Sequence, residues 1–82
     1  MTLEEEKYYD NYFSTFASDG WKQFIEEVTE IHDSYNLDTI QDLVQLKLTQ
    51  GERKILSRIL QFETGIRLAY DTIKEREAET DV

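Results

Sequence analysis

Apolar residues recur along the C-terminal half of the chain at intervals of three, four and seven residues. This spacing places them on one side of an α-helix, close to the a and d positions of a coiled coil. The resulting oligomer seam consists of Leu48, Ile55, Ile59, Phe62, Ile66, Ala69 and Ile73. Leu56 and Leu60 form a second apolar row on a flank of the same helix, and one short partner cannot cover both rows. The pattern therefore predicts a helix that associates with further copies of the chain.

This helix is expected to be long, from about residue 39 to residue 77. Asp38 and Gln41 have the spacing of a capping box at its start. A mid-helix glycine costs only about 1 kcal/mol relative to alanine, so we expect the helix to continue past Gly51, with a bend there or near Gly65. The polar tail, residues 78–82, is expected to fray.

A first helix is predicted over residues 3–17, with Thr2 and Glu5 as its capping box. It carries an aromatic face at the helical spacing i, i+3, i+4 and i+7, made of Tyr9, Tyr12, Phe13 and Phe16. Two interpretations of this face are open. The four rings pack on the later helices, or they form an exposed anchor for a partner, because Tyr and Phe are favoured in the cores of interfaces.

A second helix is predicted over residues 20–35, with Ser18 or Asp19 as its N-cap and Asn36 at its end. Its apolar stripe covers about a third of the helical circumference and is made of Trp21, Phe24, Ile25, Val28, Ile31, His32 and Tyr35. An acidic surface faces away from this stripe or flanks it, made of Glu26, Glu27, Glu30 and Asp33. The alternation is that of an amphipathic helix with one buried side.

These elements predict an all-α fold for residues 1–82 as a single domain. Two short amphipathic helices pack on one long C-terminal helix, as a helical hairpin or bundle. The chain has 82 residues, no proline and no cysteine, so few breaks and no disulfides are available. A chain this short buries only roughly 60–65% of its unfolded surface. We therefore expect oligomerisation to complete the core.

The net charge of −9 is concentrated in the first half of the chain. Residues 1–46 hold eleven carboxylates and two lysines, which leaves −9, whereas residues 47–82 hold seven carboxylates and seven basic groups, which leaves zero. Such a surface repels phosphates and membrane head groups, so we expect neither nucleic acid nor membrane as a direct partner. It is either a solvated surface that keeps the protein in solution or a site for a basic partner. Lys47, Lys54 and Arg58 follow one edge of the long helix, with Arg53 nearby, and are expected to pair with acidic groups of the same chain or of another copy.

The sequence contains no recognisable catalytic or metal-binding set. His32 is the only histidine and lies on the apolar stripe, where a packed, hydrogen-bonded role is expected. The Glu-x-x-His pattern of di-iron bundles fails, since Thr29 stands three residues before it. We therefore expect no enzyme, no cofactor, no metal and no small-molecule substrate. The start MTLEEEKYY has no basic region followed by an apolar run, so no secretion signal is expected. No apolar run in the sequence approaches the length of a membrane span, so none is expected either.

Three segments, YYDNYF, DGWKQFIEEV and QGERKILSRILQFE, occur in an order that resembles small acidic helical proteins of tailed bacteriophages. The likeness spans roughly residues 8 to 73. It implies a location in the host cytoplasm or the virion, and a structural or accessory role with virion proteins as partners. The alternative hypothesis is an acidic inhibitor whose carboxylates imitate DNA phosphates toward a host DNA-binding protein. The resemblance implies no catalytic residue.

Overall fold

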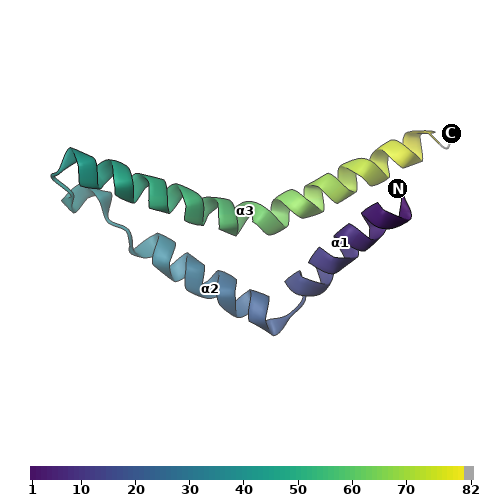
Figure 1. The fold of residues 1–82 in the computed structure, drawn as a ribbon, viewed down its shortest axis with the longest axis horizontal. Helices are drawn as coiled ribbons and strands as arrows, with labels where there is room; N and C mark the ends of the chain where they lie inside the picture. The colour runs from purple at the N-terminus through teal and green to yellow at the C-terminus, as the bar shows by residue number, and fades with distance from the viewer. Residues whose placement is uncertain (81–82) are drawn as a thin grey trace.

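The computed structural model describes residues 1–80, which form helices joined by short turns (Figure 1). The elements are α1 (Leu3–Phe16), α2 (Asp19–Ser34), the short 3-10 helix η1 (Leu37–Thr39) and α3 (Leu43–Thr80). Within the described residues there is no strand. The prediction of an all-α chain with two short helices packed on one long C-terminal helix is confirmed.

The three α-helices form a hairpin whose first arm is divided into two pieces. In Figure 1, α1 and α2 follow one another along α3, with α2 beside the first half of α3 and α1 beside its second half. Both run antiparallel to α3, so that the start of α1 and the end of α3 lie together. An ion pair between the Met1 amino group and Glu77 joins these two ends. Each stretch of α3 therefore has one helical neighbour.

The first two helices begin at the predicted caps. The Thr2 hydroxyl accepts a hydrogen bond from the backbone N–H of Glu5 at 3.1 Å, and Glu4 to Glu6 place negative charge at the positive end of α1. The Ser18 hydroxyl accepts from the backbone N–H of Trp21 at 3.1 Å and donates to the carbonyl of Thr15 at 2.6 Å. Ser18 therefore ends one helix and starts the next, which produces the sharp turn between α1 and α2.

The connection from α2 to α3 differs from the prediction. The long helix begins at Leu43 rather than near residue 39, because the Asp42 carboxylate accepts from the backbone N–H of Val44 at 2.9 Å. The Asn36 side chain instead accepts from Asp38 N–H at 3.2 Å and starts η1, a local bond that competes with helix formation. Asn36 does not adopt the left-handed conformation of a C-terminal cap, since its φ is −118°.

The long helix continues without interruption through Gly51 and Gly65, as its pattern predicts. Its 38 residues correspond to about 57 Å at 1.5 Å per residue, and the longest dimension of the molecule is 58 Å. Figure 1 shows that α3 bends in its middle, opposite the turn between α1 and α2. Of the tail that was expected to fray, residues 78–80 belong to α3, and residues 81 and 82 lie outside the described part of the chain.

The core is small. The buried apolar side chains among the described residues are Tyr9, Phe16 and Val28, and Thr49 is the buried polar one. The radius of gyration is 17.9 Å, whereas a compact chain of this length has about 12 Å. The shortest dimension is 17 Å, which exceeds the about 10–12 Å diameter of one helix by little. The molecule is therefore an elongated, thin arrangement of helices with much of its apolar surface uncovered.

Candidate functional site

An aromatic junction forms where α1, α2 and the middle of α3 meet. The Phe16 ring lies 5.0 Å from that of Trp21 and 6.2 Å from that of Phe62, measured between ring centroids. Tyr12 meets Phe62 edge to face at 5.2 Å. Such edge-to-face pairs add about 0.5–1.5 kcal/mol beyond the burial of their area. This junction connects the first helix to both of the others.

The same face of α1 continues onto the second half of α3. Tyr9 and Phe13 contact the ring of Tyr70 at 5.4 and 5.0 Å. The Arg67 guanidinium lies 5.3 Å from the centroid of Phe13 and 5.6 Å from that of Phe16. All four residues of the predicted aromatic face are thus packed against rings of the same chain, with Tyr9 and Phe16 buried and the other two half-buried.

The Glu63 carboxylate lies at the polar edge of this junction and accepts two hydrogen bonds there. It accepts one from Trp21 Nε1 at 2.9 Å and one from Arg67 Nε at 3.1 Å. The bond from the indole and then the bond from the guanidinium hold the pKa of Glu63 below its usual range. This contact could not be predicted from local patterns, because Trp21 and Glu63 are 42 positions apart.

The predicted oligomer seam divides into two rows in the structure. Ile59, Ile66 and Ile73 are half-buried beside the shorter helices. The other row is exposed: Leu48 at 58% of its surface, Ile55 at 59%, Phe62 at 39%, and Ala69 as well. The exposed row repeats every seven residues, which is the period of a helix-to-helix seam.

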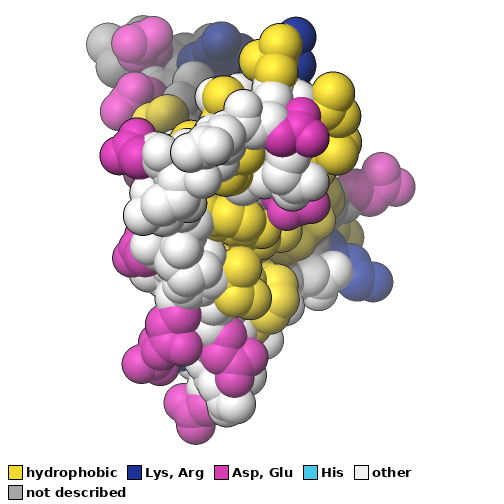
Figure 2. All heavy atoms as spheres, turned by 90° about the vertical axis from the view of Figure 1, so that its left-hand side faces the viewer, with side chains coloured by type: hydrophobic (Ala, Val, Ile, Leu, Met, Phe, Trp, Pro, Cys, Tyr) yellow, Lys and Arg dark blue, Asp and Glu magenta, His cyan; other side chains and the backbone are white. Residues whose placement is uncertain are grey.

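Exposed apolar residues of α2 extend this row into a wider surface. Phe24 and Ile31 are about half exposed on α2. A groove of about 360 Å³ runs between the two helices and is lined by Trp21, Phe24, Ile55, Arg58, Ile59 and Phe62. We call the surface made of Phe24, Ile31, Leu48, Ile55 and Phe62 the apolar face. Figure 2 shows hydrophobic side chains exposed at the α2–α3 end of the molecule, with carboxylates at their margin.

A second groove, which we call the basic groove, has a different lining. It has a volume of about 410 Å³ and is formed by His32, Leu37, Gln50, Arg53, Lys54 and Ser57. Five of these six side chains are polar, and two carry a permanent positive charge. Helical spacing alone relates Arg53 to Lys54, and only the packing of α2 on α3 brings His32 to them.

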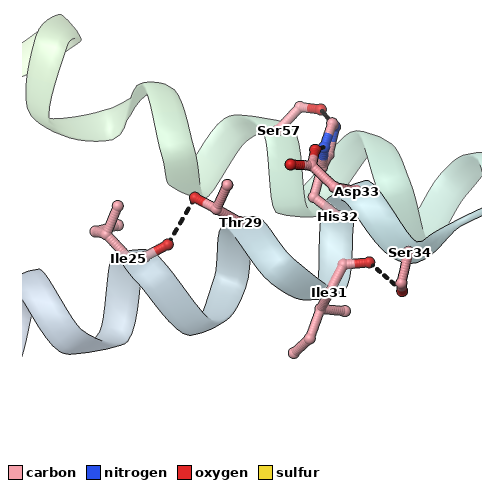
Figure 3. Close-up of polar contacts among 7 residues, drawn as sticks. All are labelled: Ile25, Thr29, Ile31, His32, Asp33, Ser34 and Ser57. Carbon is pink, nitrogen blue, oxygen red and sulfur yellow. Dashed lines mark hydrogen bonds and ion pairs between the residues drawn. The ribbon is translucent and has the colours of Figure 1, made fainter.

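His32 reaches across from α2 to α3 at one side of the basic groove (Figure 3). Its Nδ1 lies 3.0 Å from Asp33 Oδ1, and its Nε2 lies 3.0 Å from Ser57 Oγ. A carboxylate can only accept, so the bond to Asp33 places a proton on Nδ1, and Nε2 shares a hydrogen bond with the Ser57 hydroxyl. His32 is thus a hydrogen-bonded interhelical residue. Nearby, the Tyr35 hydroxyl donates to Glu52 at 3.0 Å, and this bond raises the pKa of Tyr35.

The charged surfaces remain largely unpaired. Glu26, Glu27, Glu30 and Asp33 are all exposed on α2. Lys47, Arg53, Lys54 and Arg58 are exposed on α3, and none of them forms an ion pair with a carboxylate of the described residues. The pairing expected between these basic groups and acidic groups of the same chain is therefore not made in the described structure.

Other kinds of site find no counterpart in residues 1–80. In this part of the chain, no three His, Cys, Asp or Glu side chains gather closely enough to hold a metal ion. None of the described helices combines the length and the apolar character that crossing a membrane requires. No protein family, curated protein or solved structure matches the chain. The apolar face and the basic groove are therefore the surfaces of the described structure that suggest a function.

Proposed function

We propose that the protein is a non-enzymatic structural or accessory protein that self-associates through the apolar face. The observation that carries this proposal is the exposed row Leu48, Ile55 and Phe62, which continues onto Phe24 of α2. Isolated exposed apolar side chains are ordinary, but a contiguous row at heptad spacing on a long helix is typical of a helix-packing surface.

The amount of exposed surface supports the same proposal. The chain exposes 6,614 Å². A compact monomer of 9.8 kDa exposes about 5,200 Å², so the excess is about 1,400 Å². A standard protein interface covers roughly 800 Å² on each partner. One or two contacts with further copies therefore suffice to bring the exposed surface to that of a compact protein.

Further partners in this proposal are virion proteins. The resemblance of residues 8–73 to small phage proteins supports them, and the apolar face supplies the contact. An assembled form would leave the ends of the long helices and the acidic surface of α2 free for docking. Co-purification with capsid, portal or tail proteins that persists at high salt is the expected result, because apolar contacts are not screened by ions.

Self-association is tested with two matched substitutions on α3. Ile55 and Leu68 are both exposed, at 59% and 65%, but only Ile55 belongs to the apolar face. We expect Ile55→Asp to produce a helical monomer in sedimentation equilibrium, because it places a charge in the contact, and Leu68→Asp to remain associated. Circular dichroism establishes that both variants fold. A wild-type monomer at all concentrations, or equal behaviour of the two variants, would contradict the proposal.

A second candidate function rests on the exposed carboxylates of α2. Glu26, Glu27, Glu30 and Asp33 carry no ion pair with a Lys or Arg of the described residues, and such a row can imitate the phosphates of duplex DNA. An acidic inhibitor of this kind would compete with duplex DNA for a basic DNA-binding protein, with an affinity that falls steeply with salt. Neutralisation by Glu26→Gln and Glu30→Gln should then weaken the competition. Competition that is unchanged by salt or by these variants would exclude it.

A further inference from the structure

The basic groove lies on the opposite flank of α3 from the apolar face. At 3.6 residues per turn, Arg53 and Ser57 point about 140–180° away from Ile55 and Phe62, and Lys54 about 80–100° away. The two grooves share no lining residue. Association through the apolar face therefore leaves the basic groove accessible, and its role is a separate question.

The groove concentrates positive charge in a protein whose net charge is −9. Arg53 and Lys54 both line it, and neither has a carboxylate partner among the described residues. Asp33 and Glu52, which adjoin the lining residues His32 and Arg53, are held by His32 and Tyr35, and Asp38, which adjoins Leu37, forms no ion pair with Arg53 or Lys54 among the described residues. The cations are therefore left to interact with a ligand from solution.

We propose that the basic groove binds a small phosphate-bearing anion, either inorganic phosphate or a phosphate monoester. The Arg53 guanidinium can bind two phosphate oxygens at once, and the Lys54 ammonium supplies a second positive charge. The Gln50 amide adds a neutral donor on the same side of α3. The volume of about 410 Å³ falls in the range of roughly 300–1,000 Å³ that small-ligand sites have.

The distribution of charge favours a small anion over a nucleic acid. At physiological ionic strength, charges more than about 8 Å away are largely screened, so an anion inside the groove is affected by Arg53 and Lys54 and by the nearby Asp33, and only weakly by the rest of the net charge. A duplex would extend past the groove and meet the acidic surface of α2, where Glu26 and Glu30 repel its phosphates. The groove thus selects by size as well as by charge.

The proposal is tested by NMR titration of the full chain at constant ionic strength, with inorganic phosphate and with glycerol phosphate as probes. We expect saturable shifts of the Gln50, Arg53 and Ser57 amides with millimolar affinity. Tighter binding of glycerol phosphate identifies a monoester as the ligand, and equal or tighter binding of inorganic phosphate identifies the free anion. Chloride at the same ionic strength should produce no saturable shift.

Two pairs of variants with the same change in charge locate the site. We expect Arg53→Gln with Lys54→Gln to weaken phosphate binding at least about tenfold, because two charge-assisted hydrogen bonds are lost. Lys7→Gln with Lys47→Gln, which lie outside the groove, should change it by less than about twofold. Circular dichroism checks the fold of both pairs. Ile55→Asp should bind phosphate like the wild type, so a failure of self-association leaves this test intact.

Three results would overturn the proposal. The first is the lack of any saturable shift with either probe. The second is an equal loss of phosphate affinity in the two pairs of variants, which would show that binding depends on the overall charge of the protein and not on the groove. The third is a short DNA duplex that binds more tightly than either probe and depends on the same two cations, which would make the groove a nucleic-acid site.

Discussion

The two halves of α3 carry similar apolar residues and have different surroundings. Along its second half, α1 covers one side of the helix with aromatic rings, and Tyr9 and Phe16 are buried, while Leu68 on another side is exposed. Along its first half, α2 covers one side with Val28 and His32 and leaves the apolar face open. A heptad pattern by itself does not separate these two cases.

The difference has a physical origin in the size of the side chains that α1 and α2 offer. Large rings on α1 reach across the contact and pack edge to face on Phe62 and Tyr70 of α3. The stripe of α2 has three smaller aliphatic side chains, Ile25, Val28 and Ile31, between its rings, and its own Phe24 and Ile31 are about half exposed. The second half of α3 together with α1, which we call the closed region, therefore stabilises the monomer. We infer that the first half of α3 together with α2, which we call the open region, packs against another copy of the chain.

The largest effect is expected in the closed region from Phe16→Ala. Phe16 is only 3% exposed and touches rings from all three helices. Its loss should lower the free energy of unfolding by about 3–5 kcal/mol, measured by urea denaturation. Tyr8→Ala, at a half-exposed position of the same helix, is the control and should cost less than about 1 kcal/mol. Similar values for both would show that the junction is not the core.

A smaller effect is expected where the two regions meet, from Ile59→Asp. Ile59 is half-buried and lines the apolar groove, so an unpaired carboxylate there should cost about 1–3 kcal/mol. The charge also faces the proposed contact between copies. We expect the protein to dissociate or unfold. Sedimentation measures the dissociation, and circular dichroism measures the unfolding. A folded and still associated Ile59→Asp variant would indicate that this part of the seam is misassigned.

A pH dependence is expected from Glu63, which joins Trp21 and Arg67 at the edge of the closed region. Its pKa is lowered in the folded state, so its contribution to stability is complete above the ordinary Glu pKa of about 4.3. That contribution is lost as the pH falls through the lowered value. The stability difference between wild type and Glu63→Gln should therefore shrink on acidification, measured by denaturation at several pH values. Because the carboxylate is more than a third exposed, solvent screening keeps the effect below that of Ile59→Asp.

Glu75→Gln is the control for this pH dependence. Glu75 is exposed on the same helix and forms no hydrogen bond or ion pair in the described part of the chain. Its substitution should leave the decrease of the free energy of unfolding at acidic pH the same as in the wild type. An identical response of the Glu63 and Glu75 variants would mean that the bonds to Trp21 and Arg67 contribute nothing in solution.

Much of the fold follows from local patterns that the sequence displays. The caps Thr2 and Ser18 have the residue types that N-caps require, and the spacing of apolar residues predicts the three helices. The start of α3 was missed because Asn36, Asp38 and Asp42 can each accept a backbone hydrogen bond. The choice among them depends on how the turn packs, which no local pattern contains.

The arrangement of the surfaces was harder to predict. The spacing placed Ile55 and Ile59 in one seam, but α2 and α3 pack so that the former is exposed and the latter half-buried. The basic groove joins His32 to Ser57, which are 25 positions apart and have no sequence signature in common. Arg53, Lys54 and Ser57 lie within about one turn of a helix. That spacing is the part of the basic groove that the sequence alone could have indicated.

The smallest effect is expected from Gly51→Ala in the open region. Gly51 is exposed within α3, and a Cβ atom there would meet nothing within 4 Å. Alanine should stabilise the helix by about 0.5–1 kcal/mol, detected as a higher melting temperature, and Gly65→Ala in the other half should do the same. Gly51 lies between Leu48 and Ile55 along the exposed row. If Gly51→Ala stabilises the monomer but weakens self-association, a second helix approaches α3 closely at this glycine, whereas unchanged association places the contact on the side chains of the apolar face alone.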